Sequence, residues 1–144
     1  MSAIRTLQRA LPRSRPAMSA PIMMTNRPRL FHATASAQAI HELKSKSDFD
    51  AAVKQHKTII IDAFAEWCGP CHMISPIYAK LSDAYPSIRF YKFDVDHVQD
   101  LSAALEIRAM PTFSIFQDGK RLEQVVGANP QALKVVLDRL SKED

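Results

Sequence analysis

An almost unbroken run of β-branched and apolar residues, TIIIDAFA, extends from Thr58 to Ala65. A strand that is buried on both faces has this pattern, because the helices of an α/β protein cover both sides of a parallel sheet. We therefore expect a central parallel strand here. Asp62 is the one ionisable residue within the run.

Shorter patterns on either side predict the other elements. Ser47, Asp96 and Asn129 are expected to be helix N-caps, and Asp118-Gly119 is typical of a hairpin turn. The expected strands are residues 39–43, 58–65, 88–94, 112–117 and 120–126, and the expected helices are about 47–55, 68–84, 97–105 and 130–142. Strands that alternate with helices predict an α/β fold with a mixed, mostly parallel five-stranded sheet, helices on both faces and an antiparallel edge.

The N-terminal segment has a different composition. Residues 1–41 contain six arginines and no lysine, aspartate or glutamate. Ile4, Leu7 and Leu11 would share one face of a helix, with arginines on the opposite face. These features are typical of a mitochondrial transit peptide. We expect residues 1–38 to engage the mitochondrial import machinery and residues 39–144 to form one domain.

This interpretation places the protein in the mitochondrion, with the matrix favoured because no sorting segment follows the predicted presequence. A disordered basic arm and a plastid transit peptide remain alternatives. The basic pI of 9.2 belongs to this segment, since the rest of the chain holds 13 basic and 15 acidic residues. We therefore do not expect nucleic-acid binding.

The only two cysteines, Cys68 and Cys71, are separated by Gly-Pro where the central strand gives way to a helix. A helix N-terminus favours an anion, so the pKa of the Cys68 thiol should fall below that of free cysteine. The thiolate is the form that attacks disulfides. Cys68 would attack a target disulfide, and Cys71 would then attack Cys68 to release the reduced target.

Asp62 is the candidate base for the proton of Cys71. A carboxylate within an apolar strand is costly to ionise, so burial should raise its pKa. It would then accept the proton directly or through a water. Lys92 lies on the next strand and could face Asp62, although a solvated strand lysine fits the spacing as well.

The segment IDAFAEWCGPC resembles the active-site segment of the thioredoxin family, and Ile107–Thr112 and Val126–Ala128 resemble two further active-site loops of that family. The likeness covers about residues 39–144. It implies a thioredoxin fold and a protein-disulfide reductase that uses a redox-active Cys68–Cys71 disulfide and no other cofactor. It also implies recycling by thioredoxin reductase, and we expect a monomer.

The resemblance assigns further residues. Asp62 and Lys92 match a buried acid and its lysine partner, and Pro111 matches a cis-proline beside the disulfide. Met110 would offer backbone groups to an extended target peptide. The implied docking surface consists of Trp67, Gly69, Pro70, Met110, Val126 and Gly127.

Three other interpretations compete with this one. Cys68-x-x-Cys71-His72 also matches a c-type haem attachment site, but the preceding β pattern and the proline between the cysteines fit it poorly. A closed zinc site needs four ligands, and this segment offers three, so we expect no metal. The third interpretation is a binding or chaperone module with this fold and no essential redox turnover.

Overall fold

The computed structural model describes residues 40–142, and the predicted transit peptide and its junction with the domain lie outside the described residues. The elements are β1 (His41–Glu42), α1 (Lys46–Gln55), β2 (Thr58–Phe64), α2 (Gly69–Ala84), β3 (Arg89–Asp94), α3 (Gln99–Ala104), β4 (Thr112–Gln117), β5 (Lys120–Val126) and α4 (Pro130–Leu140). Their order is the predicted one. No helix within residues 40–142 combines the length and the apolar character needed to cross a bilayer.

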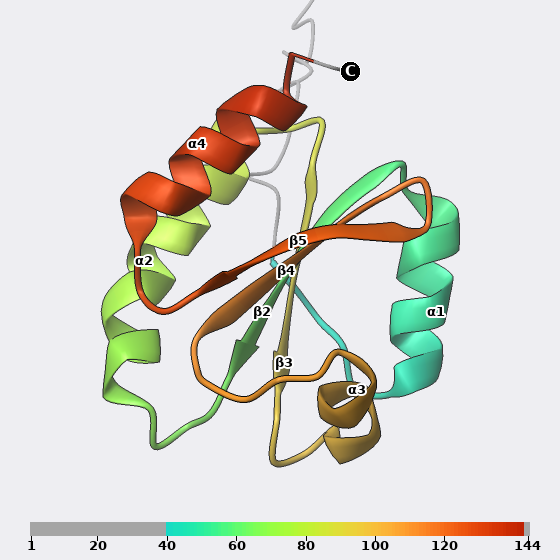
Figure 1. Ribbon diagram of the computed structural model, residues 1–144, viewed down its shortest axis with the longest axis vertical. Coiled ribbons are helices and arrows are strands. Elements are labelled where there is room, and N and C mark those ends of the chain that lie inside the picture. The colour runs from blue at the N-terminus through green and yellow to red at the C-terminus, as the bar shows by residue number, and fades with distance from the viewer. Residues whose placement is uncertain (1–39, 143–144) are drawn as a thin grey trace, which may run out of the picture. The chain divides into compact units, whose positions relative to one another are not determined.

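The five strands form one sheet in the order β1-β3-β2-β4-β5. β3 pairs in parallel with β1 and β2, whereas β4 pairs antiparallel with both β2 and β5. Four strands therefore run in one direction and β4 runs against them. Figure 1 shows α2 and α4 on one side of the sheet and α1 and α3 on the other. The predicted mixed α/β fold is confirmed.

Side chains of β2 contribute alternately to two apolar clusters, one on each face of the sheet. Ile59, Ile61 and Ala63 belong to the apolar cluster that includes α1 and α3, and Ile60 belongs to the cluster that includes α2 and α4. Successive side chains of a strand point to opposite faces, so an apolar run buries both. Asp62 has the same parity as Ile60 and therefore faces α2.

Two predicted helix caps are wrong. Ser45, rather than Ser47, caps α1: its backbone is extended and its hydroxyl accepts a hydrogen bond from the Asp48 N–H. α3 begins later than expected, with Val98 at its N-cap position and no side-chain cap. The Asp96 carboxylate is instead engaged by an indole from another loop. The Asn129 cap is confirmed by its 3.1 Å bond from the Ala132 N–H.

Tyr78 fixes α2 to the sheet and so fixes the loop that precedes the helix. Its hydroxyl lies 3.1 Å from the Ile60 carbonyl oxygen and 2.8 Å from that of Tyr91. Its ring packs against Phe90 and Phe113 within the same core. The N-terminal end of α2 consequently has a defined position at the carboxyl end of β2.

Candidate active site

Cys68 and Cys71 form a disulfide at the start of α2, with their Cα atoms 5.3 Å apart. Cys68 is the N-cap residue, and Pro70 lies in the first turn, where a missing N–H costs no helical hydrogen bond. Each cysteine is only 4% exposed. The sequence thus places one sulfur at the helix terminus and the second one turn further on.

The backbone around Cys68 favours negative charge on its sulfur. The Cys71 N–H donates a hydrogen bond to Cys68 Sγ at 3.2 Å, and the helix N-terminus adds its partial positive charge. Both interactions stabilise a thiolate more than a thiol once the disulfide is reduced. Cys68 is therefore the better placed of the two sulfurs to act as nucleophile.

A cleft of about 170 Å³ connects Cys71 with Asp62, and Phe64, His72, Ser75 and Lys92 complete its lining. Asp62 is 5% exposed, and its Oδ1 has no hydrogen-bond partner within residues 40–142. Burial raises the pKa of Asp62 to about 7, against a smaller lowering by the Lys92 charge. A carboxyl with this pKa exchanges protons readily near neutral pH.

Lys92 lies opposite Asp62 in the register of β2 and β3. Its ammonium group sits 5.3 Å from the centre of the Phe64 ring, a favourable cation–π arrangement. The structure therefore brings the two charged residues singled out from the sequence to one cleft. Within residues 40–142, no group of three or more histidine, cysteine or acidic side chains gathers in a way that could hold a metal ion.

A second loop lies against the cysteines. The Met110–Pro111 peptide bond is cis, and Met110 packs against the cluster of Ala65, Cys68 and Cys71. The Gly127 N–H donates to the Pro111 carbonyl oxygen at 2.8 Å, which ties this loop to the end of β5. Gly127 has a φ of 90°, a conformation that glycine adopts without steric cost.

The residues expected to form a docking surface are largely open to solvent. Trp67 is 69% exposed and Val126 is 61% exposed, and Gly69 and Pro70 are also exposed. The Trp67 indole N–H donates to Asp96 Oδ2 at 2.8 Å. Sequence reasoning missed this role of Asp96, although its place directly after a parallel strand put it at the same sheet edge as the cysteines.

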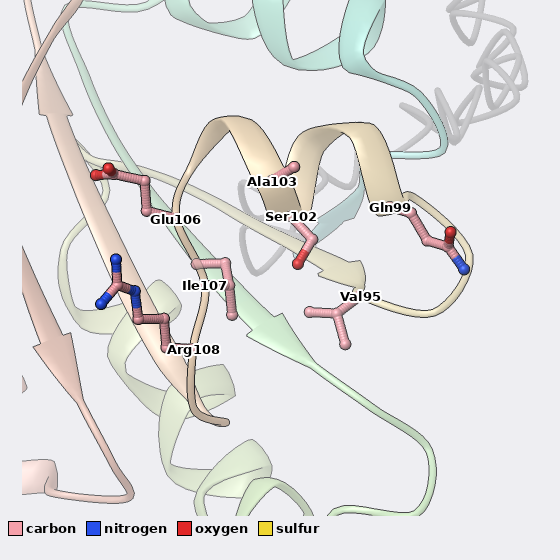
Figure 2. A pocket seen from close by; sticks show the side chains of 7 residues that line it. All are labelled: Val95, Gln99, Ser102, Ala103, Glu106, Ile107 and Arg108. Carbon is pink, nitrogen blue, oxygen red and sulfur yellow. The ribbon is translucent and has the colours of Figure 1, made fainter.

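A larger cleft, of about 400 Å³, lies beside α3, and Figure 2 shows the residues that line it: Val95, Gln99, Ser102, Ala103, Glu106, Ile107 and Arg108. Val95 also packs against the cysteine cluster. This cleft therefore adjoins the redox pair without containing either sulfur. The sequence did not indicate it, because its residues are Val95, which follows β3, and residues of α3 and the loop after α3.

Comparison with known proteins supports the resemblance. The thioredoxin family matches residues 40–139. The chain is similar to thioredoxin-2 of Pyricularia oryzae, with 46% identity over 74% of this chain and 63% of that protein, less than two thirds of its length. It is also similar to thioredoxin-1 of Saccharomyces cerevisiae, with 46% identity over 66% of this chain and 92% of the yeast protein.

Among solved structures, oxidised mitochondrial thioredoxin 3 of Saccharomyces cerevisiae is similar, with a TM-score of 0.68 and 41% identity, covering 69% of this chain and 94% of that one. Residues 40–139, which match the family, contain the cysteine pair and the buried carboxylate. The chain belongs to the thioredoxin family, whose members are thiol–disulfide oxidoreductases.

Proposed function

We propose that the protein reduces disulfides of other proteins in the mitochondrial matrix. The observation that carries this proposal is the Cys68–Cys71 pair at the N-terminus of α2, with buried Asp62 lining the same cleft as Cys71. This arrangement supplies a nucleophilic sulfur, a resolving sulfur and a base. The disulfide in the structure is the product state of that reaction.

In the reduced protein, the Cys68 thiolate attacks one sulfur of a target disulfide. A bond forms between Cys68 and the target, and the other target sulfur leaves as a thiolate. Cys71 then attacks Cys68 Sγ, which breaks the mixed disulfide and releases the second target thiolate. The target gains two electrons, and the protein is left with the Cys68–Cys71 disulfide.

The second step requires Cys71 to lose its proton. Asp62 has a pKa of about 7, so a large fraction of it is ionised and able to accept a proton at neutral pH. The cleft has room for a water between the carboxylate and the sulfur. Lys92, which lowers the pKa of Asp62, keeps the base partly ionised.

The exposed residues around the disulfide bind the target protein. Trp67, Gly69, Pro70, Val126 and Gly127 surround the pair with a surface of low charge. Met110 supplies backbone groups for an extended target segment, and Pro111 holds the chain beside the sulfurs. A thioredoxin reductase would return the disulfide to the dithiol, and the protein would work as a monomer without a bound cofactor.

Insulin reduction tests the proposal. The full chain, incubated with NADPH and thioredoxin reductase, should consume NADPH in proportion to insulin disulfides reduced. A Cys68→Ser, Cys71→Ser double variant should show only the blank rate. NADPH consumption at the blank rate by the parent chain would reject the reductase proposal and favour a binding module with this fold.

The matrix location rests on the arginine-rich, acid-free segment at residues 1–38. A relative of similar sequence is named as mitochondrial. Import into isolated mitochondria should depend on this segment and on the membrane potential. Equal uptake of the chain without residues 1–38 would contradict the location.

A further inference from the structure

We propose that Arg121 and Gln124 of β5 act as positioning residues that hold the Met110–Pro111 loop in the conformation that binds protein disulfides. This inference rests on the proposed function and adds residues that touch neither cysteine. Both side chains donate hydrogen bonds to one acceptor, the carbonyl oxygen of Leu105, at 3.1 and 2.8 Å. Leu105 follows directly after α3 and is buried.

These bonds satisfy a carbonyl that the helix itself leaves without a partner. The last four carbonyl groups of a helix have no intrahelical donor. Arg121 also bonds to the Glu106 carboxylate at 2.9 Å, and Gln124 also donates to Ser114 Oγ at 3.0 Å. The two side chains therefore link β5 to the end of α3 and to β4.

A bulge in β5 makes this double contact achievable. Ser114 pairs with Gln124 and Ile115 with Glu123, but Phe116 pairs with Arg121, which leaves Leu122 as an extra residue. In a regular strand, residues three apart point to opposite faces. Because the bulge adds one residue, Arg121 and Gln124 point to the same face of the sheet although they are three residues apart. This is the face that α3 covers.

β5 thereby controls both ends of the loop that follows α3. Arg121 and Gln124 hold its beginning at Leu105, and the Gly127 N–H holds its end at the Pro111 carbonyl. Glu106, the first residue after Leu105, has a φ of 56°. That conformation is unfavourable for a non-glycine residue, so surrounding contacts must help to hold it.

Gln124 also lines a cleft of about 250 Å³ between this loop and β5, together with Glu106, Arg108, Ala109, Thr112 and Val126. Figure 2 shows Glu106 and Arg108 on the segment that leaves α3 toward the loop. Of the pair Arg121 and Gln124, which we call the clamp, Gln124 therefore lines the space between the two segments that carry Met110 and Val126. Loosening the clamp should move the docking surface without disturbing the cysteines.

The proposed base, Asp62, lies on the face of the sheet opposite to Arg121 and Gln124. Asp62 faces α2, whereas Ser114 and Phe116, the register partners of Gln124 and Arg121, face α1 and α3. Loss of the clamp should raise KM for a protein disulfide and leave kcat, the Cys68 thiol pKa and the rate with a small disulfide unchanged.

The test uses the full chain with the substitutions Gln124→Leu and Arg121→Met, singly and together. The matched control is Glu123→Gln, which removes an ionic contact between the same strand and Arg139 of α4. We expect KM for insulin to rise about three- to tenfold in the double variant, with kcat and the rate with 5,5′-dithiobis(2-nitrobenzoic acid) within twofold of the parent. Arg121→Lys, which keeps the charge and one donor, should recover part of the loss.

An unchanged KM in the double variant would overturn the proposal, as would equal losses with insulin and the small disulfide. Hydrogen exchange gives a readout independent of reduction and of global folding. In either single variant the amides of Glu106 and Ile107, which donate to the Ala103 and Ser102 carbonyl oxygens, should exchange at least fivefold faster, while those of α2 stay unchanged. If the parent fails to reduce insulin, the proposed function fails, and the exchange rates alone decide whether the clamp exists.

Discussion

Asp62 and Lys92 are register partners on β2 and β3, and both line the cleft that reaches Cys71. Burial raises the pKa of Asp62 to about 7, while the nearby ammonium group lowers it by a smaller amount. The same carboxyl is therefore a source of instability and, in the proposed mechanism, the acceptor of the Cys71 proton. These two consequences can be measured separately.

Asp62→Asn should change how stability depends on pH. The folded protein holds the Asp62 proton up to about pH 7, whereas the unfolded chain releases it near 3.8. Between these values the folded state binds more protons, so the parent loses stability as pH rises. The variant lacks this loss, and its advantage in free energy of unfolding should grow by about 4 kcal/mol from pH 3 to pH 8.

Urea unfolding of the oxidised proteins at several pH values measures this difference. Asp94→Asn is the matched control, because Asp94 is also buried and accepts a hydrogen bond from the Asp96 N–H but does not line the cleft. A constant difference between Asp62→Asn and the parent across this range would contradict the raised pKa.

Asp62→Asn should also slow the resolving step. With a thionitrobenzoate group attached to Cys68, release of that group reports the attack by Cys71. We expect release at pH 7 to be at least tenfold slower than in the parent, because the variant lacks a base for the Cys71 proton. The difference should shrink as the pH approaches the pKa of the thiol itself.

The first attack by Cys68 serves as the internal control for that experiment, since Asp62 takes no part in it. Equal release rates in the parent and the variant at pH 7 would remove Asp62 from the mechanism. A loss in both steps would indicate damage to the cysteine loop instead.

Lys92→Met should raise the pKa of Asp62 further, because the ammonium group is the charge that lowers it. The pH at which the resolving step reaches half its maximum should move upward from about 7 in the variant. Lys80→Met, on the exposed side of α2, controls for the loss of a positive charge. A downward shift, or none, would show that Lys92 does not act on this carboxyl.

Asp96→Ala should weaken target binding through Trp67. The variant removes the acceptor of the 2.8 Å indole hydrogen bond and lets an exposed ring adopt other rotamers. KM for insulin should rise severalfold, while the rate with a small disulfide stays the same. The fluorescence of Trp67, the only tryptophan in the sequence, should change in the same variant. Unchanged fluorescence and unchanged KM would contradict this role.

Asn129→Ala should lower the free energy of unfolding by about 1 kcal/mol, since the variant loses the N-cap bond to the Ala132 N–H. Ser47→Ala should have a smaller effect, because Ser47 does not cap α1. Thermal or urea unfolding measures both. A larger loss for the Ser47 variant would contradict the assignment of Ser45, rather than Ser47, as the cap of α1.

Strong periodicity made most of the fold predictable. The apolar run of β2 required burial on both faces, and the proline after Asn129 fixed the start of α4. Ser45 and Ser47 could not be told apart, because either hydroxyl fits a cap and the backbone conformation of the flanking residues decides between them. The bulge at Leu122 was equally hidden, since register depends on the partner strand.

The part of the candidate site that lies within one short segment of the sequence was predictable. Cys68 and Cys71 are adjacent in sequence, and Asp62 stands out as a charge within an apolar strand. The indole–carboxylate bond between Trp67 and Asp96 joins residues far apart in the chain, as do the contacts of Arg121 and Gln124 with Leu105. No local pattern reports such contacts. The matrix location and the transit peptide stay predictions.

The disulfide at the start of α2 uses every cysteine of the chain. The oxidised protein therefore has no sulfhydryl left to alkylate, and full reduction exposes two. Mass tagging with a maleimide would read the redox state directly as zero or two adducts per molecule. A Cys71→Ser variant keeps Cys68 as its one cysteine, so every protein that it captures as a mixed disulfide would be attached through a single, known sulfur.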